Sequence, residues 1–120
     1  MLPDAGDIVW VDFDPVRGTE QAGRRPALVL TSQIYHEGTR RSFVCPITRT
    51  MRDWPPNVRL PAGLKTTGII LVDQIRVIDR TERMFDSIES VPADVLTTVR
   101  LNLAALLGIE VPLPTGRQAP

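Results

Sequence analysis

Short apolar runs, bounded by glycine, proline or polar residues, dominate the first two thirds of the chain. They are rich in valine, isoleucine and aromatic residues, a composition that is typical of β-strands. Some are apolar almost throughout, which is the pattern of a buried strand. We therefore predict five or six strands, the last two either separate or continuous, at residues 7–13, 26–31, 42–48, 57–60, 68–72 and 74–78.

The spacing of apolar residues changes near residue 90. From there they recur at the period of an α-helix, at Val95, Val99 and Leu103. Pro92 is tolerated in a first helical turn because its missing N–H needs no partner there, and Gly108 is a favourable stop. The pattern predicts a helix over residues 90–107.

Polar segments rich in glycine and proline separate the predicted strands. They predict two long loops at residues 14–25 and 49–56, and a hairpin loop at residues 32–41. Long loops in compact domains are often functional. Pro46 cannot donate a backbone hydrogen bond, so it predicts that its strand ends at a sheet edge or in a bulge.

The length of 120 residues and an apolar content of 42% are those of one globular domain. We place this domain at residues 1–111 and expect a flexible tail at 112–120. Strands followed by one late helix predict a mainly β fold, a strongly bent antiparallel sheet or barrel with a packed helix.

Single copies of cysteine and histidine exclude several kinds of site. Cys45 is the only cysteine and His36 the only histidine, so the chain cannot form an intramolecular disulfide, a Cys-rich zinc site or a histidine pair for acid–base catalysis. We therefore expect no metal and no cofactor. We interpret His36 as an incidental loop residue and Cys45 as a small apolar strand residue. The acidic start and the lack of a long apolar stretch predict no signal peptide or membrane span, and hence a cytoplasmic protein.

Positive charge is concentrated in the middle of a neutral chain. Residues 17–59 contain eight arginines against three acidic residues. Arginine's planar fork matches pairs of phosphate oxygens, so this segment could form a phosphate-binding face. The alternative, left open by charge alone, is an ordinary solvated surface.

Polar residues at strand ends are the candidates for a site. Arg24 and Arg25 stand directly before the strand at 26–31, and Thr48 ends the strand at 42–48, each beside a long loop. Their structural alternatives are surface arginines and a turn-forming hydroxyl. Asp12 and Asp14 could together hold magnesium, but solvated carboxylates explain them better.

Three blocks of sequence read GDIVWVDFDPVRGTEQAGRRPALVL at residues 6–30, VCPIT at 44–48 and TTGIILVDQIRVID at 66–79. In order and spacing, and together with the late helix, they resemble the MazF/PemK family of toxin endoribonucleases. The resemblance implies a small SH3-like antiparallel barrel of the MazF/PemK/CcdB type with a C-terminal helix. It also implies a homodimer that cleaves single-stranded RNA without a metal and is neutralised by a cognate antitoxin.

The resemblance also implies roles for individual residues. Arg25 and Thr48 match positions implicated in catalysis, and Glu20 is our hypothetical proton acceptor, with a solvated loop glutamate as its alternative. Trp54 could stack on a base or be a packed loop anchor. The residues expected to contact RNA are Thr19, Gln21, Arg24, Arg49, Arg52, Trp54, Asp73 and Gln74.

Two positions depart from the family pattern. Some members have a histidine where Thr19 stands and an arginine where Leu71 stands, so mechanisms that need those groups do not transfer directly. The implied reaction is attack of a ribose 2′-hydroxyl on the adjacent phosphate, giving a 2′,3′-cyclic phosphate and a free 5′-hydroxyl. Arg25 would stabilise the growing negative charge and Thr48 would donate one more hydrogen bond.

Two other functions remain as alternatives. One is a toxin that inhibits DNA gyrase by binding, as in the CcdB family, but that family depends on a Trp-Gly-Ile ending and this chain ends Gln-Ala-Pro. The other is a non-catalytic SH3-like module that binds peptides or nucleic acid. Six aromatic residues are few for an aromatic peptide groove.

Overall fold

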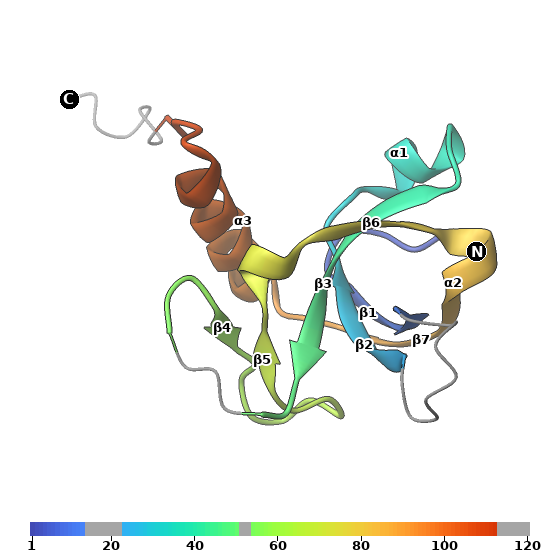
Figure 1. Ribbon diagram of the computed structural model, residues 1–120, viewed down its shortest axis with the longest axis horizontal. Coiled ribbons are helices and arrows are strands. Elements are labelled where there is room, and N and C mark those ends of the chain that lie inside the picture. The colour runs from blue at the N-terminus through green and yellow to red at the C-terminus, as the bar shows by residue number, and fades with distance from the viewer. Residues whose placement is uncertain (14–22, 51–53, 113–120) are drawn as a thin grey trace.

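The computed structural model describes residues 1–13, 23–50 and 54–112, except the side chain of Phe85. Within these residues, seven antiparallel strands form one curled sheet, with a long helix packed against one side (Figure 1). The strands are β1 (Asp7–Asp12), β2 (Arg24–Val29), β3 (Arg41–Thr48), β4 (Val58–Arg59), β5 (Ile69–Ile70), β6 (Arg76–Asp79) and β7 (Met84–Ser90). The helices are α1 (Gln33–Glu37), α2 (Arg80–Arg83), α3 (Ala93–Leu107) and the short 3₁₀ turn η1 (Val72–Gln74). This confirms the predicted mainly β fold with a C-terminal helix.

Strand β3 is central, which makes the prediction of a sheet edge at Pro46 wrong. The sheet order is β4-β5-β3-β2-β1-β7, and β6 also pairs with β3. Along one side, β3 pairs with β6 at residues 41–44 and with β5 at residues 47–48. Pro46 lies in the gap between these two partners, where its carbonyl oxygen accepts from the N–H of Leu71 at 2.9 Å. The missing N–H of proline therefore breaks no ladder.

Both faces of the sheet are buried, which explains the continuous apolar runs. Alternate residues of each strand point to opposite faces. One set, including Ile8 and Leu28, packs with α3 residues Val95 and Val99. The other fills the inside of the curl, with Val9, Val11, Phe13, Ala27, Val29, Val44 and Ile78.

Strand β7 and helix α2 were not predicted, and helix α3 begins later than predicted. The β1–β7 ladder has register shifts between Ile8 and Val9 and between Val9 and Val11. Such irregularities break the alternation by which a half-buried strand is found in a sequence. Ser90 pairs with Asp7 in this ladder, so α3 starts only at Ala93. Gly108 ends the helix as predicted, with a left-handed φ of 72°.

The predicted hairpin loop at residues 32–41 contains α1, and His36 is not incidental. The imidazole is buried, with 2% of the residue exposed. Its Nδ1 donates to the carbonyl oxygen of Pro3 at 2.8 Å, and its Nε2 lies within hydrogen-bond distance of the hydroxyls of Thr31 and Ser42, at 2.7 and 2.8 Å. His36 therefore ties the N-terminal segment to β3. In contrast, the prediction for Cys45 is confirmed, because it is fully buried in the core, where burial raises its thiol pKa to about 12.

None of the helices in the described ranges is long and apolar enough to cross a bilayer. The predicted tail at 112–120 lies outside the described residues from residue 113 onward.

Candidate functional site

Arg25 and Thr48 lie on neighbouring strands at the same end of the sheet. The β2–β3 ladder ends at the pair of Ala27 and Pro46, and Arg25 and Thr48 each lie two residues beyond this pair, toward the same end of the two antiparallel strands. Arg25 stands inside β2 rather than directly before it, because the strand begins at Arg24, two residues earlier than predicted. Arg25 is exposed and Thr48 half-buried, so both are open to a ligand.

Both side chains line one open pocket of about 630 Å³. Its walls combine basic groups and hydroxyls with an apolar floor, and the described part of the chain contributes no carboxylate to them. The lining residues are Trp10, Arg24, Arg25, Pro26, Ile47, Thr48, Arg49, Lys65, Thr66, Thr67 and Ile88. Such a lining suits a phosphodiester with an unstacked base beside it.

The Thr48 hydroxyl is oriented by its own turn. Its Oγ1 accepts a hydrogen bond from the backbone N–H of Thr50 at 3.1 Å. This bond uses an oxygen lone pair, so the hydroxyl hydrogen stays available for a ligand.

The backbone of Thr48 is held by a close approach of Gly68, which precedes β5. Gly68 has φ of +133°, and a Cβ at this position would clash with the Thr48 carbonyl oxygen. Only glycine combines this backbone conformation with such close packing.

Arg25 also lines a second pocket. It has a volume of about 420 Å³ and is lined by Phe13, Arg25, Pro46, Gln74 and Arg76. The Arg76 guanidinium carbon lies 5.1 Å from the centroid of the Phe13 ring, and its Nη1 donates to the Phe13 carbonyl oxygen at 3.4 Å. Arg25 therefore borders two pockets and can contact groups in either.

The structure brings some of the predicted RNA-binding residues together and leaves others apart. Arg24 and Arg49 share the larger pocket with Arg25, and Gln74 lines the smaller one. Asp73 is exposed on η1 and lines neither pocket. The residues Thr19, Glu20, Gln21 and Arg52 lie outside the described residues.

Trp54 lies in a different pocket from Arg25 and Thr48. This pocket, of about 600 Å³, is formed by residues 54–57 and by α3, and the Asn102 amide there donates to the Pro56 carbonyl oxygen at 2.9 Å. The indole is 59% exposed, so Trp54 is neither a buried anchor nor part of the lining around Arg25.

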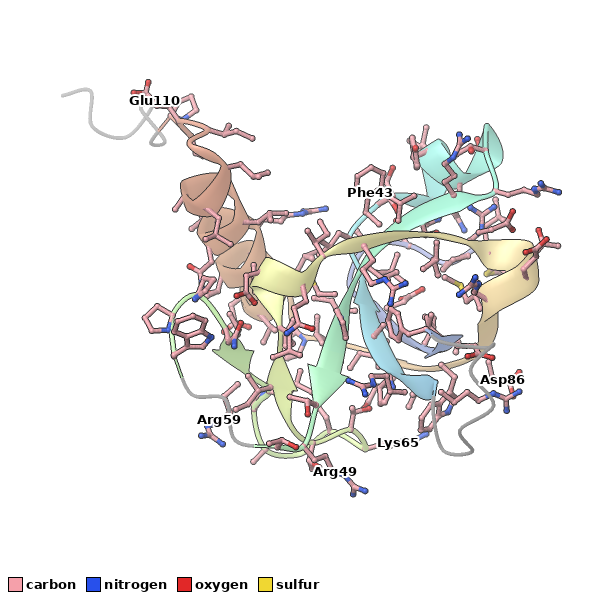
Figure 2. All side chains as sticks on the ribbon, in the orientation of Figure 1. Phe43, Arg49, Arg59, Lys65, Asp86 and Glu110 are labelled. Carbon is pink, nitrogen blue, oxygen red and sulfur yellow. The ribbon has the colours of Figure 1, made fainter. Side chains whose placement is uncertain are left out.

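Sequence reasoning missed one wall of the larger pocket, formed by Lys65, Thr66 and Thr67. Lys65 is the only lysine of the chain, which is the one signal that could have singled it out. In Figure 2, Lys65 and Arg49 lie at the same end of the molecule. Sequence reasoning also missed Trp10, which is 40% exposed between the buried Val9 and Val11.

Glu89 on β7 holds this wall. Its Oε1 accepts from the backbone N–H of Lys65 at 2.9 Å, and its Oε2 from that of Thr66 at 2.7 Å. Partial burial alone would raise the pKa of the Glu89 carboxyl, but the hydrogen bonds from Lys65 and Thr66 outweigh it and hold this pKa below its usual value. The group is therefore an ionised acceptor at neutral pH.

Among the described residues, no three His, Cys, Asp or Glu side chains gather where they could hold a metal ion. Of the acidic pair considered for magnesium, Asp12 lies half-buried on β1 and Asp14 lies outside the described residues.

Comparisons with known proteins identify the family. Residues 4–107 match the model of the PemK-like, MazF-like toxins of type II toxin–antitoxin systems. The chain is 36% identical over 107 residues to endoribonuclease toxin MazF of Escherichia coli K12, covering 89% of this chain and 96% of that protein. It is 32% identical over 104 residues to endoribonuclease EndoA of Bacillus subtilis, covering 82% and 89% of the two chains.

Solved structures give the same assignment. The crystal structure of MazF from Deinococcus radiodurans superposes with a TM-score of 0.79 at 41% identity, covering 91% of this chain and 99% of that one. A MazE–MazF crystal structure from the same organism gives a TM-score of 0.81 at 39% identity, covering 92% and 100%. The chain belongs to the PemK/MazF family of toxins of type II toxin–antitoxin systems.

Proposed function

We propose that this chain is an endoribonuclease that cleaves single-stranded RNA in the pocket shared by Arg25 and Thr48. The observation that carries the proposal is this pocket, where an arginine and a threonine from two strands meet among further basic side chains. The curated relatives from Escherichia coli and Bacillus subtilis, both named endoribonucleases, support the activity.

The proposed reaction uses a nucleophile that RNA itself supplies. The ribose 2′-hydroxyl loses its proton and its oxygen bonds to the adjacent phosphorus, while the bond from phosphorus to the 5′-oxygen breaks and that oxygen takes up a proton. The products are a 2′,3′-cyclic phosphate and a 5′-hydroxyl.

Arg25 and Thr48 would act on the phosphate. Negative charge grows on the non-bridging oxygens in the transition state, and the guanidinium can donate two parallel hydrogen bonds to them. The Thr48 hydroxyl can donate another. Arginine has a pKa above about 12 and is a poor base near neutral pH, so we assign Arg25 an electrostatic role.

The test is incubation of the purified protein with a long RNA, followed by mapping of the cut sites and of the chemistry at both ends. We expect 2′,3′-cyclic phosphate and 5′-hydroxyl ends. Ends with a 5′-phosphate and a 3′-hydroxyl would contradict the mechanism. RNA bound but left intact would favour the non-catalytic module, and inhibited DNA supercoiling with intact RNA would favour the gyrase-binding alternative.

Removal of metal ions should leave cleavage unchanged. The nucleophile belongs to the substrate and the charge is stabilised by arginine, so no step needs a metal. We expect the same initial rate, within about twofold, in excess EDTA and without it. Strong inhibition by EDTA that added magnesium reverses would overturn this prediction.

Glu20→Gln should lower the cleavage rate and flatten its dependence on pH. A carboxylate that accepts the 2′-hydroxyl proton must be ionised, and an amide cannot take its place, so we expect a loss of about 10²- to 10⁴-fold. Glu37→Gln is a suitable control, because Glu37 is exposed on α1, away from the pocket. An unchanged pH–rate profile in Glu20→Gln would exclude Glu20 as the base.

Partners follow from the same site. We propose that bases are read by the segments that precede β2 and follow β3, at residues 14–23 and 49–56, because unstacked bases are what proteins recognise in single-stranded RNA. A disordered acidic or apolar segment of a cognate antitoxin would cover the face around Arg25. The crystal structures of MazE–MazF from Deinococcus radiodurans support a protein partner, because they show a relative assembled with MazE. We also propose a cytoplasmic homodimer, and the exposed apolar side chains of α3, including Leu101 and Leu107, could contribute to its interface.

A further inference from the structure

The segment at residues 65–67 crosses from β4 to β5 as one wall of the larger pocket, and it is fixed at both ends. At one end, both oxygens of the Glu89 carboxylate accept backbone N–H groups, those of Lys65 and Thr66. At the other end, Gly68 packs against the carbonyl of Thr48, and its own carbonyl oxygen accepts from the N–H of Leu60 at 2.9 Å. A connection between two short strands is thus held from two sides.

The position of Glu89 connects this wall to the rigid part of the sheet. β7 pairs with β1, and Glu89 is the partner of Ile8, a fully buried core residue. Its neighbour Ile88 lines the same pocket as Arg25 and Thr48. The carboxylate therefore links the 65–67 segment to β7, the strand whose Ile88 also lines the pocket.

The wall brings a cation and an exposed hydroxyl to the pocket. Lys65 is exposed and Thr67 is exposed, whereas Thr66 is buried beneath them with 7% of its surface accessible. An ammonium on a flexible stem is useful for phosphate binding only when its backbone is held in place, because ordering a loop on binding costs conformational entropy.

We propose that Glu89 is a positioning residue, which fixes the 65–67 segment so that Lys65 binds a phosphate next to the scissile linkage. The inference rests on the proposed function and adds a second phosphate site to it. Glu89 itself does not touch the RNA. It acts through the backbone of Lys65 and Thr66, and its two hydrogen bonds are formed before substrate arrives.

The prediction separates substrate binding from the chemical step. Glu89→Ala should raise KM for the mapped RNA about tenfold while kcat stays within about threefold, because Arg25 and Thr48 are untouched. Lys65→Ala should raise KM by a similar factor and reduce the slope of log KM against log salt concentration by about one, as expected for one lost phosphate contact. Binding is checked separately with the same RNA carrying a 2′-deoxy nucleotide at the cut site, which lacks the nucleophile.

The decisive measurement is the double variant. If Glu89 acts only through Lys65 and its segment, Glu89→Ala combined with Lys65→Ala should bind RNA no worse than the weaker of the two single variants. The proposal would be overturned if the losses of RNA affinity in the two single variants simply add in the double variant. It would also be overturned if Lys65→Ala leaves KM and the salt slope unchanged. A general structural role for Glu89 would instead lower the melting temperature and kcat with KM unchanged, and that result also overturns it.

A conservative variant of Glu89 and a control variant elsewhere complete the test. Glu89→Gln preserves the size of the side chain but leaves one acceptor for two N–H donors, so it should show an intermediate KM even if Glu89→Ala does not fold. Glu110→Gln removes a carboxylate at the far end of α3, at the opposite end of the molecule from Lys65 (Figure 2), and should behave as wild type. If the wild-type protein does not cleave RNA, the proposed function fails and this role fails with it. If it cleaves RNA and Glu89→Ala matches wild type, only the positioning role fails.

Discussion

Replacing Arg25 with alanine should reduce the rate of RNA cleavage by about 10²- to 10³-fold and leave the fold intact. This is the usual loss when one donor to a developing oxyanion is removed. The Arg25 side chain is exposed at the pocket rim, so its loss should change the free energy of unfolding by no more than about 0.5 kcal/mol. Cleavage of the mapped RNA and thermal unfolding of the same preparation are the two measurements.

Two variants make the Arg25 result specific. Arg25→Lys keeps the positive charge but loses the planar fork, so its rate should fall between those of wild type and Arg25→Ala. Arg40→Ala removes an exposed arginine whose Nη2 lies 3.4 Å from the Asp79 carboxylate, away from the pocket, and should cleave at the wild-type rate. An Arg25→Ala protein that is unfolded, or that cleaves normally, would return Arg25 to a structural or incidental role.

Replacing Gly68 with alanine should both destabilise the protein and slow its cleavage of RNA. A side chain at φ of +133° is strained, and its Cβ would press on the Thr48 carbonyl. Together, strain and overpacking should lower the free energy of unfolding by about 2–4 kcal/mol. Because relief of the contact must shift Thr48, cleavage by the folded fraction should fall on the order of 10- to 100-fold.

The chain contains a matched control for this substitution. Gly63 also has a positive φ, of +96°, but a Cβ there would meet nothing within 4 Å. Gly63→Ala should therefore show only the cost of the backbone strain, about 1 kcal/mol, with normal cleavage. Equal losses of stability in urea unfolding for the two variants would show that the contact with Thr48 does not matter.

Strands that are buried on both faces of the sheet could be predicted from the sequence. Strands with an irregular pairing register could not. The runs containing Leu28 and Ile47 identify buried strands without knowledge of their partners. β7 was missed because its bulged pairing with β1 removes the simple alternation. The prediction for Pro46 was wrong because it assumed that one side of the strand has a single neighbouring strand, whose ladder a proline would interrupt. On that side, β3 instead changes its partner from β6 to β5 around Pro46.

For the site, the limits were different. Arg25 and Thr48 could be singled out as polar residues at strand ends, and the family resemblance gave them roles. Glu89 could not, because a carboxylate that binds backbone N–H groups more than twenty residues away leaves no spacing signature. Its partners are main-chain atoms, which every residue possesses, so only the folded geometry identifies them.

The place of Arg25 between two pockets has a consequence for the length of the substrate. A phosphate held by this guanidinium lies beside both of them, one cavity of about 630 Å³ and one of about 420 Å³. A linkage in the interior of a polynucleotide can fill both, whereas the terminal linkage of a strand leaves one of them empty. We therefore expect the enzyme to sever chains internally and to be inefficient at trimming single nucleotides from their ends.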